Sequence, residues 1–195
     1  MLGDPLTVVA LLGKTFRDLR IEYAVVGSLA TSMYGIPRAT QDVDLVAAIA
    51  PGDAARVARA LAGALEGEFH ADEDAIREAI EAGGAFNVIH LATMFKADIF
   101  LAHSDEWSRN QIARSRLQEI PTTSGTVEFR VASPEDVILH KLRWYRLGDE
   151  TSERQWNDVL GVMRIQGSAL NDDYLDKFAS VLGVADLISR ARAQV

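Results

Sequence analysis

The stretch from Ile21 to Val46 constrains the fold most strongly, because it places two short apolar runs close together along the chain. The first run, IEYAVVG (21–27), is rich in β-branched residues and ends in glycine, which predicts a buried strand. The segment SLATSMYG (28–35) predicts a short helix, and DVDLVAAI (42–49) predicts a second strand. We therefore expect a sheet flanked by helices.

The remaining pattern predicts an α/β (α+β) fold in two parts. Asp4-Pro5 is expected to start a first helix, and the later apolar patterns predict strands at 85–91, 94–102 and 125–132 and helices at 51–65, 72–84 and 105–115. Ser133-Pro134 is a strong helix start, and only helices are expected after it, at 134–147, 152–164, 171–182 and 184–193. The expected domains are 1–132, with a mixed sheet, and 133–195, a helical segment packed against it because no flexible linker separates the two.

Composition excludes several functions. The 195 residues carry a net charge of −8, which argues against a broad nucleic-acid-coating or membrane-surface role. The absence of cysteine excludes disulfides and thiol nucleophiles. The first residues do not resemble a signal peptide, and no apolar run approaches the roughly 20 residues that span a bilayer. We expect a cytoplasmic protein without membrane contact.

Asp42 and Asp44 flank a single valine on the second predicted strand. Side chains alternate between the faces of a strand, so both carboxylates project from one face, with Cα atoms about 7 Å apart. Two such carboxylates repel each other unless a cation lies between them. Mg²⁺ suits this place, because it takes oxygen ligands and accepts substrate phosphates as further ligands.

Asp98 is a third candidate, because it is the only charge in the apolar run ADIFLA (97–102). An ionised aspartate in a buried strand needs a metal or a partner, and Lys96 or an arginine could be that partner. If this strand lies beside 42–49, three carboxylates can hold two metal ions, or one ion and a general base.

Gly27-Ser28 is a candidate phosphate site. Glycine lets the backbone approach an anion closely, and the N–H groups of the following helix point toward it. Ser28 adds a hydroxyl donor, and it is also compatible with an ordinary helix N-cap. Arg38, between this turn and the aspartates, can reach a phosphate or an acceptor, although a loop arginine is commonly just solvated.

The sequences VVGSLA...QDVDLV and KADIF together resemble the motifs of the nucleotidyltransferase superfamily, of the DNA polymerase β type. The segment 133–163 resembles the helical region of abortive-infection toxin nucleotidyltransferases, the AbiEii-like proteins, in which a helix with a lysine precedes a helix with an arginine and an aspartate. The matching residues are Lys141, Arg154 and Asp158. In the family the arginine and aspartate are often adjacent, whereas three residues separate them here.

The resemblance implies transfer of a nucleoside monophosphate from an NTP to a hydroxyl, with release of pyrophosphate. It implies that Gly27 and Ser28 hold the triphosphate, and that Lys141 neutralises its β- and γ-phosphates. It also implies that Mg²⁺ lies on the two aspartates of the DVD motif and that the third aspartate completes the site and activates the acceptor.

Simpler interpretations of the helical residues stay open. Lys141 can cover apolar surface or pair with Asp158 between two helices. Arg154 and Asp158 are four residues apart and can form an ordinary ion pair along one helix.

The acceptor is left open by the sequence. A toxin-like enzyme, with a possible antitoxin partner, would modify tRNA or another RNA; the other acceptors are a protein or a small antibiotic-type molecule. The rival from another class is a nonenzymatic binding or antitoxin-like module of the same fold, and the three intact aspartates argue against it.

Overall fold

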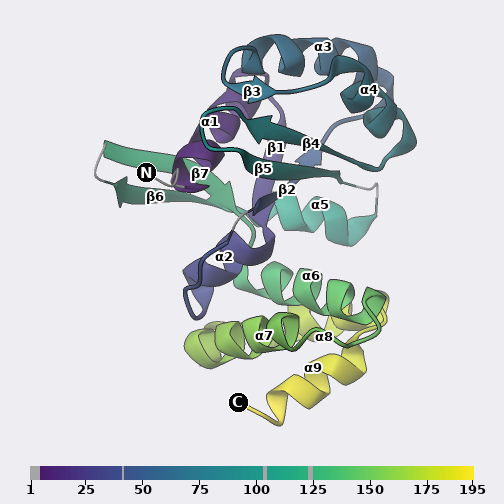
Figure 1. The fold of residues 1–195 in the computed structure, drawn as a ribbon. Helices are drawn as coiled ribbons and strands as arrows, with labels where there is room; N and C mark the ends of the chain where they lie inside the picture. Colours follow the sequence, from purple (N-terminus) through teal and green to yellow (C-terminus); the bar gives the residue numbers. More distant parts are fainter. Residues whose placement is uncertain (1–4, 41, 103–104, 123–124) are drawn as a thin grey trace. The chain divides into compact units, whose positions relative to one another are not determined.

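The structure is a computed structural model that describes residues 5–40, 42–102, 105–122 and 125–195. It is a mixed α/β fold, as the sequence predicts (Figure 1). Two compact units make up the chain: unit 1 comprises residues 1–25 and 40–131, and unit 2 comprises residues 26–39 and 132–195. The predicted cap Asp4 lies outside the described residues.

Unit 1 contains a seven-stranded sheet in the order β3-β4-β5-β2-β1-β7-β6. The strands are β1 (Glu22–Val26), β2 (Asp42–Ala48), β3 (Phe69–His70), β4 (Ala85–His90), β5 (Phe95–Leu101), β6 (Arg116–Thr122) and β7 (Gly125–Val131). The pairs β2–β5 and β1–β7 are parallel, whereas β3–β4, β4–β5 and β6–β7 are antiparallel. The antiparallel pairs β4–β5 and β6–β7 join strands that follow each other directly in the chain, whereas helices lie between the strands of the other pairs.

The helices of unit 1 cover the sheet through apolar faces. They are α1 (Pro5–Asp18), α3 (Ala54–Leu65), preceded by the 3₁₀ turn η1 (Pro51–Asp53), α4 (Glu73–Ala82) and α5 (Glu106–Ala113). Helix α1 packs on β7, α4 packs on α3 and β4, and α5 packs on β2. Residues at helical spacing, such as Val8, Leu12 and Phe16 of α1, are fully buried and build the core with the inner strand residues.

Unit 2 is helical. It contains α2 (Gly27–Tyr34), α6 (Pro134–Leu147), α7 (Glu153–Gln166), the 3₁₀ turn η2 (Gly167–Ala169), α8 (Asp172–Val181) and α9 (Ala185–Arg192). Figure 1 shows α6 to α9 gathered together, and α2 contacts both α6 and α7. Among the described residues, no helix has the length and apolar character needed to cross a membrane.

Two features differ from the sequence-based expectation. Residues 26–39 group with the C-terminal helices, because α2 packs on α6 and α7, whereas the division drawn from the sequence placed them in 1–132. Strands β3 and β6 were not expected. Strand β6 contains Pro121 and alternates between exposed and half-buried residues, so it lacks the apolar signature of a core strand.

Gly35 closes α2 against α7, and we predict that Gly35→Ala lowers the free energy of unfolding by about 2 kcal/mol. An added Cβ would lie 2.9 Å from the backbone nitrogen of Val162 and 3.1 Å from the carbonyl carbon of Gly161, and neither backbone atom can give way easily. Urea unfolding followed by circular dichroism measures the change.

Gly63 provides the matched control. It lies on α3 with nothing within 4 Å of the added Cβ, so Gly63→Ala should stabilise its helix by up to about 1 kcal/mol. Equal effects of the two substitutions would contradict the close packing of α2 on α7.

Candidate functional site

The carboxylates of Asp42, Asp44 and Asp98, here called the carboxylate group, lie on one face of the parallel pair β2–β5. Asp44 and Asp98 are direct register partners, and Asp42 is two residues away on the same face of β2. Val43 and Leu45 point to the opposite face and are fully buried, as are Ala97 and Ile99 of β5. The apolar residues therefore fix the register, and the register brings the three aspartates together.

Lys96 and Thr40 contact the carboxylate group. The Lys96 ammonium lies 2.7 Å from Oδ2 of Asp98, and the Thr40 hydroxyl donates a 2.8 Å hydrogen bond to Oδ1 of Asp42. The hydrogen bond to Asp98 raises the pKa of Lys96 above its usual value, and the charges of all three aspartates act in the same direction. The group thus favours a positive charge.

The donor set of the carboxylate group suits a hard divalent cation, because it offers only carboxylate oxygens around one face of two strands. Within the described part of the chain, however, no three histidine or carboxylate side chains already converge on a common metal position. Asp98 instead faces Lys96. The residues are of the right type for Mg²⁺, and an ammonium lies against one of them.

Unit 2 contains a second polar arrangement, the Ser28 cluster, which consists of Ser28, Arg38, Lys141 and Asp158. Arg38 binds the Asp158 carboxylate through two nitrogens, at 2.9 and 2.8 Å, and donates to the Ser28 hydroxyl at 2.6 Å. The Lys141 ammonium lies 3.0 Å from Oδ2 of Asp158 and 3.3 Å from the Ser28 hydroxyl. Two cations therefore converge on one serine oxygen, and both pair with Asp158.

Two charged groups of the Ser28 cluster are buried, so each needs a partner of opposite charge. The side chains of Lys141 and Asp158 are only 5% and 7% exposed. Burial acts to raise the pKa of Asp158, but the hydrogen bonds and charges of Arg38 and Lys141 outweigh burial and hold that pKa below its ordinary value of 3.8. Asp158 is thus ionised in the folded protein at neutral pH.

Helix α2 begins with a glycine and has an apolar N-cap residue. Gly27 adopts a φ of 62°, which glycine tolerates, and directly follows the last residue of β1. The N-cap residue is Val26, and no side chain caps the helix. Ser28 is therefore not the N-cap; it lies inside the first turn and its hydroxyl belongs to the Ser28 cluster.

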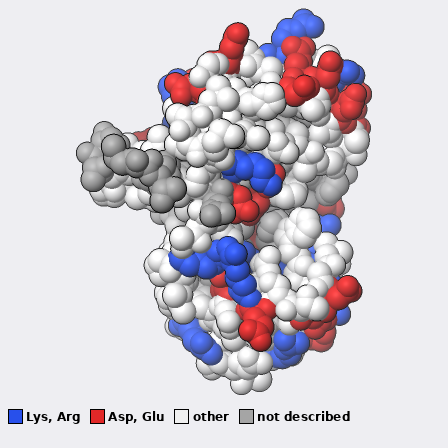
Figure 2. Space-filling model, in the orientation of Figure 1, with Lys and Arg blue, Asp and Glu red and all other residues white. Residues whose placement is uncertain are grey.

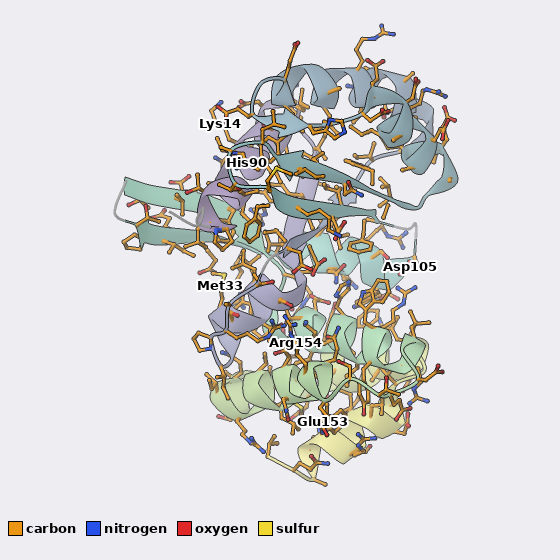
Figure 3. The ribbon with its side chains drawn as sticks, in the orientation of Figure 1. Lys14, Met33, His90, Asp105, Glu153 and Arg154 are labelled. Carbon is orange, nitrogen blue, oxygen red and sulfur yellow. The ribbon has the colours of Figure 1, made fainter. Side chains whose placement is uncertain are left out.

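Arg154 lies apart from this network of contacts. It is exposed in the first turn of α7, where Figure 3 labels it. Asp158 pairs with Arg38 and Lys141 instead of with Arg154, so the structure does not form the ion pair along one helix. The pairing of Lys141 with Asp158 between α6 and α7 is present, as one simpler interpretation of the sequence expects.

The structure therefore brings the sequence-derived candidates into two groups, one in each unit, with Arg154 outside both. Lys96, expected from the sequence as a possible partner of Asp98, does pair with it. Two polar residues were not among the candidates: Thr40, and Ser32, whose hydroxyl bonds the backbone of Arg38 and fixes the loop after α2. Their signal is proximity in sequence, since each lies within a few residues of a candidate.

Comparison with known proteins shows the fold. No protein-family model and no curated protein matches this chain. An antigenic nucleotidyltransferase-like protein from Paracoccidioides brasiliensis is similar at 19% identity, over 96% of this chain and 92% of its own, with a TM-score of 0.52. The antibiotic-resistance factor ANT(2'')-Ia is similar at 16% identity, over 100% and 96%, with a TM-score of 0.53. Its complex with adenylyl-2''-tobramycin gives 12% identity, 91% and 96% coverage and a TM-score of 0.50. This chain has the fold of these nucleotidyltransferases.

We predict that Asp158→Asn lowers the free energy of unfolding by about 3 kcal/mol at pH 7, because it removes the negative charge that the buried Lys141 contacts at 3.0 Å. A carboxylate with a depressed pKa stabilises the protein above its unfolded pKa and loses that effect as the pH falls through its folded pKa. The difference between wild type and variant should therefore shrink below pH 3.8, the ordinary value. Urea unfolding at a series of pH values measures it.

Asp186→Asn is the control, because Asp186 also pairs with an arginine, Arg146, but on the exposed surface of α9. This variant should change stability little. An equal loss in both variants, or a loss at Asp158 that persists unchanged into acid, would contradict the role assigned to the buried pair.

Proposed function

We propose that this protein is a Mg²⁺-dependent nucleotidyltransferase, which transfers a nucleoside monophosphate from an NTP to a hydroxyl and releases pyrophosphate. The observation that carries the proposal is the register of β2 and β5, which gathers three aspartates on one face of the sheet of a nucleotidyltransferase fold. Like charges so close together are costly unless a cation binds them, and a functional metal site explains their presence.

In the proposed reaction, the Ser28 cluster and the start of α2 bind the triphosphate. The N–H groups at the start of α2, whose N-cap Val26 makes no side-chain cap, and the Ser28 hydroxyl are proposed donors to phosphate oxygens. Lys141 and Arg38 converge on that hydroxyl, so their positive charges lie where a phosphate would accept hydrogen bonds. Arg154, exposed on α7, is a further candidate phosphate contact, and Asp158 keeps both cluster cations oriented.

Asp42, Asp44 and Asp98 are the residues proposed to hold Mg²⁺. When bound, the metal supplies Lewis-acid stabilisation of the negative charge on the transferred phosphoryl group. Thr40 orients the Asp42 carboxylate through its hydrogen bond. Asp98 is proposed to accept the proton of the acceptor hydroxyl.

For the acceptor, we propose a small hydroxylated, cationic molecule. The net charge of −8 attracts a cation and repels the phosphates of RNA. Acidic and basic side chains are interspersed over α3 and α4, at the top of Figure 2, and several of them form ion pairs. The similar protein ANT(2'')-Ia was solved with an adenylylated aminoglycoside, adenylyl-2''-tobramycin.

The proposed transfer of a nucleoside monophosphate from an NTP is tested with α-labelled NTPs, Mg²⁺ and cell extract. We predict incorporation of label into an acceptor, reduced at least about 100-fold in Asp44→Asn because a metal ligand is lost. Asp53→Asn, which changes an aspartate exposed at the start of α3, should retain wild-type incorporation. Labelling that is unchanged in Asp44→Asn would rule out the carboxylate group as the metal site. If no label is incorporated and NTP with Mg²⁺ leaves the melting temperature unchanged, the nonenzymatic module replaces this proposal.

The identity of the acceptor is tested by incubating the active enzyme separately with aminoglycosides, total tRNA and denatured protein. We predict that mass spectrometry finds a nucleoside monophosphate added to the cationic small molecule, and that raised ionic strength weakens this reaction. Transfer to tRNA would overturn the small-molecule proposal and favour a toxin-like enzyme, for which an antitoxin partner would then be sought.

A further inference from the structure

The geometry points to Lys96 as an internal cation that occupies Asp98 when no metal is bound and that a divalent cation must displace in order to bind. This inference rests on the proposed function, because it concerns how the carboxylate group acquires its metal. It assigns Lys96 as a positioning residue and competitor for the metal, and not as a catalytic residue.

The first observation is placement. Lys96 and Asp98 are two residues apart on β5, so both point to the face that carries the carboxylate group, and the register partner of Lys96 is Asp42. The Lys96 side chain therefore starts beside Asp42, while its ammonium lies 2.7 Å from Oδ2 of Asp98. Lys96 thus forms an ion pair with the carboxylate group from within the same strand as Asp98.

The second observation is the chemistry of the contact. The ammonium binds Oδ2 of Asp98, one of the oxygens that a metal would use. A lysine ammonium and a divalent cation repel each other strongly at contact distance, so they cannot share that oxygen. Binding of the metal at Asp98 therefore requires the ammonium to leave.

The third observation is that the ammonium is free to leave. The side chain of Lys96 is 47% exposed, whereas that of Asp98 is 21% exposed. A lysine has a flexible four-carbon stem and a well-hydrated head group, so moving the ammonium into water costs little. Lys96 thus offsets carboxylate repulsion in the metal-free protein without blocking the site permanently.

The test compares Mn²⁺ binding by calorimetry, without nucleotide, in wild type, Lys96→Met and Lys96→Arg. Methionine keeps an unbranched apolar stem and removes the charge. We expect Lys96→Met to bind Mn²⁺ about tenfold more tightly than wild type, because the competing positive charge is absent. Lys96→Arg, which keeps the charge, should remain near wild type. In EDTA, Lys96→Met should melt at a lower temperature, because the carboxylate group loses the positive charge that contacts Asp98.

Lys14→Met is the matched control. Lys14 forms a similar 2.7 Å contact with Asp18, but on the exposed surface of α1, where Figure 3 labels it. This variant should change neither Mn²⁺ affinity nor the melting temperature in EDTA appreciably.

Equal or weaker Mn²⁺ binding by Lys96→Met overturns the inference. Asp44→Asn separates this failure from failure of the proposed function. If Asp44→Asn weakens Mn²⁺ binding while Lys96→Met leaves it unchanged, the metal site stands and only the role of Lys96 is wrong. If Mn²⁺ binds neither wild type nor Lys96→Met, both are wrong.

Discussion

Parallel pairing of β2 with β5 is the constraint on which the proposed chemistry depends. The pairing is set by apolar residues, with Val43, Leu45, Ala97 and Ile99 all excluded from solvent on one face. A shift by one residue would place these side chains in water and turn the aspartates into the core, at a large cost in free energy. The hydrophobic core therefore enforces a concentration of negative charge that electrostatics alone would disperse. A cation resolves the repulsion: Lys96 in the structure described here, and Mg²⁺ in the reaction that we propose.

The Ser28 cluster poses the complementary problem, with two positive groups on one buried hydroxyl. Asp158 balances them, and it does so from α7, 120 residues along the chain from Arg38. Breaking a buried ion pair by removing one partner is costly, so the cluster is sensitive to substitution, and its mutual contacts hold Lys141 and Arg38 in place. Rigid placement of Lys141 and Arg38 is what a phosphate site requires, because donors that are already oriented need no reorganisation when the anion binds.

Much of the fold and half of the geometry of the candidate site could be predicted from the sequence. Alternation of apolar residues with aspartates predicts the face on which Asp42 and Asp44 lie, and the lone acid Asp98 in an apolar run suggests a partner strand. The contact between Arg38 and Asp158 could not be predicted, because nothing local links a loop residue to a helix 120 positions later. Strand β6 was missed because an edge strand with Pro121 carries little apolar signal. The grouping of α2 with the C-terminal helices depends on packing, which periodicity does not encode.

The most direct test of the account is a crystal grown with Mn²⁺ and a non-hydrolysable NTP, measured at the manganese absorption edge. The account predicts an anomalous peak about 2.1 Å from carboxylate oxygens of Asp42, Asp44 or Asp98. It further predicts that the Lys96 ammonium has left Asp98 and that phosphate oxygens accept hydrogen bonds from Ser28 and Lys141. An anomalous peak elsewhere, or a bound nucleotide that contacts neither the carboxylate group nor the Ser28 cluster, would contradict it.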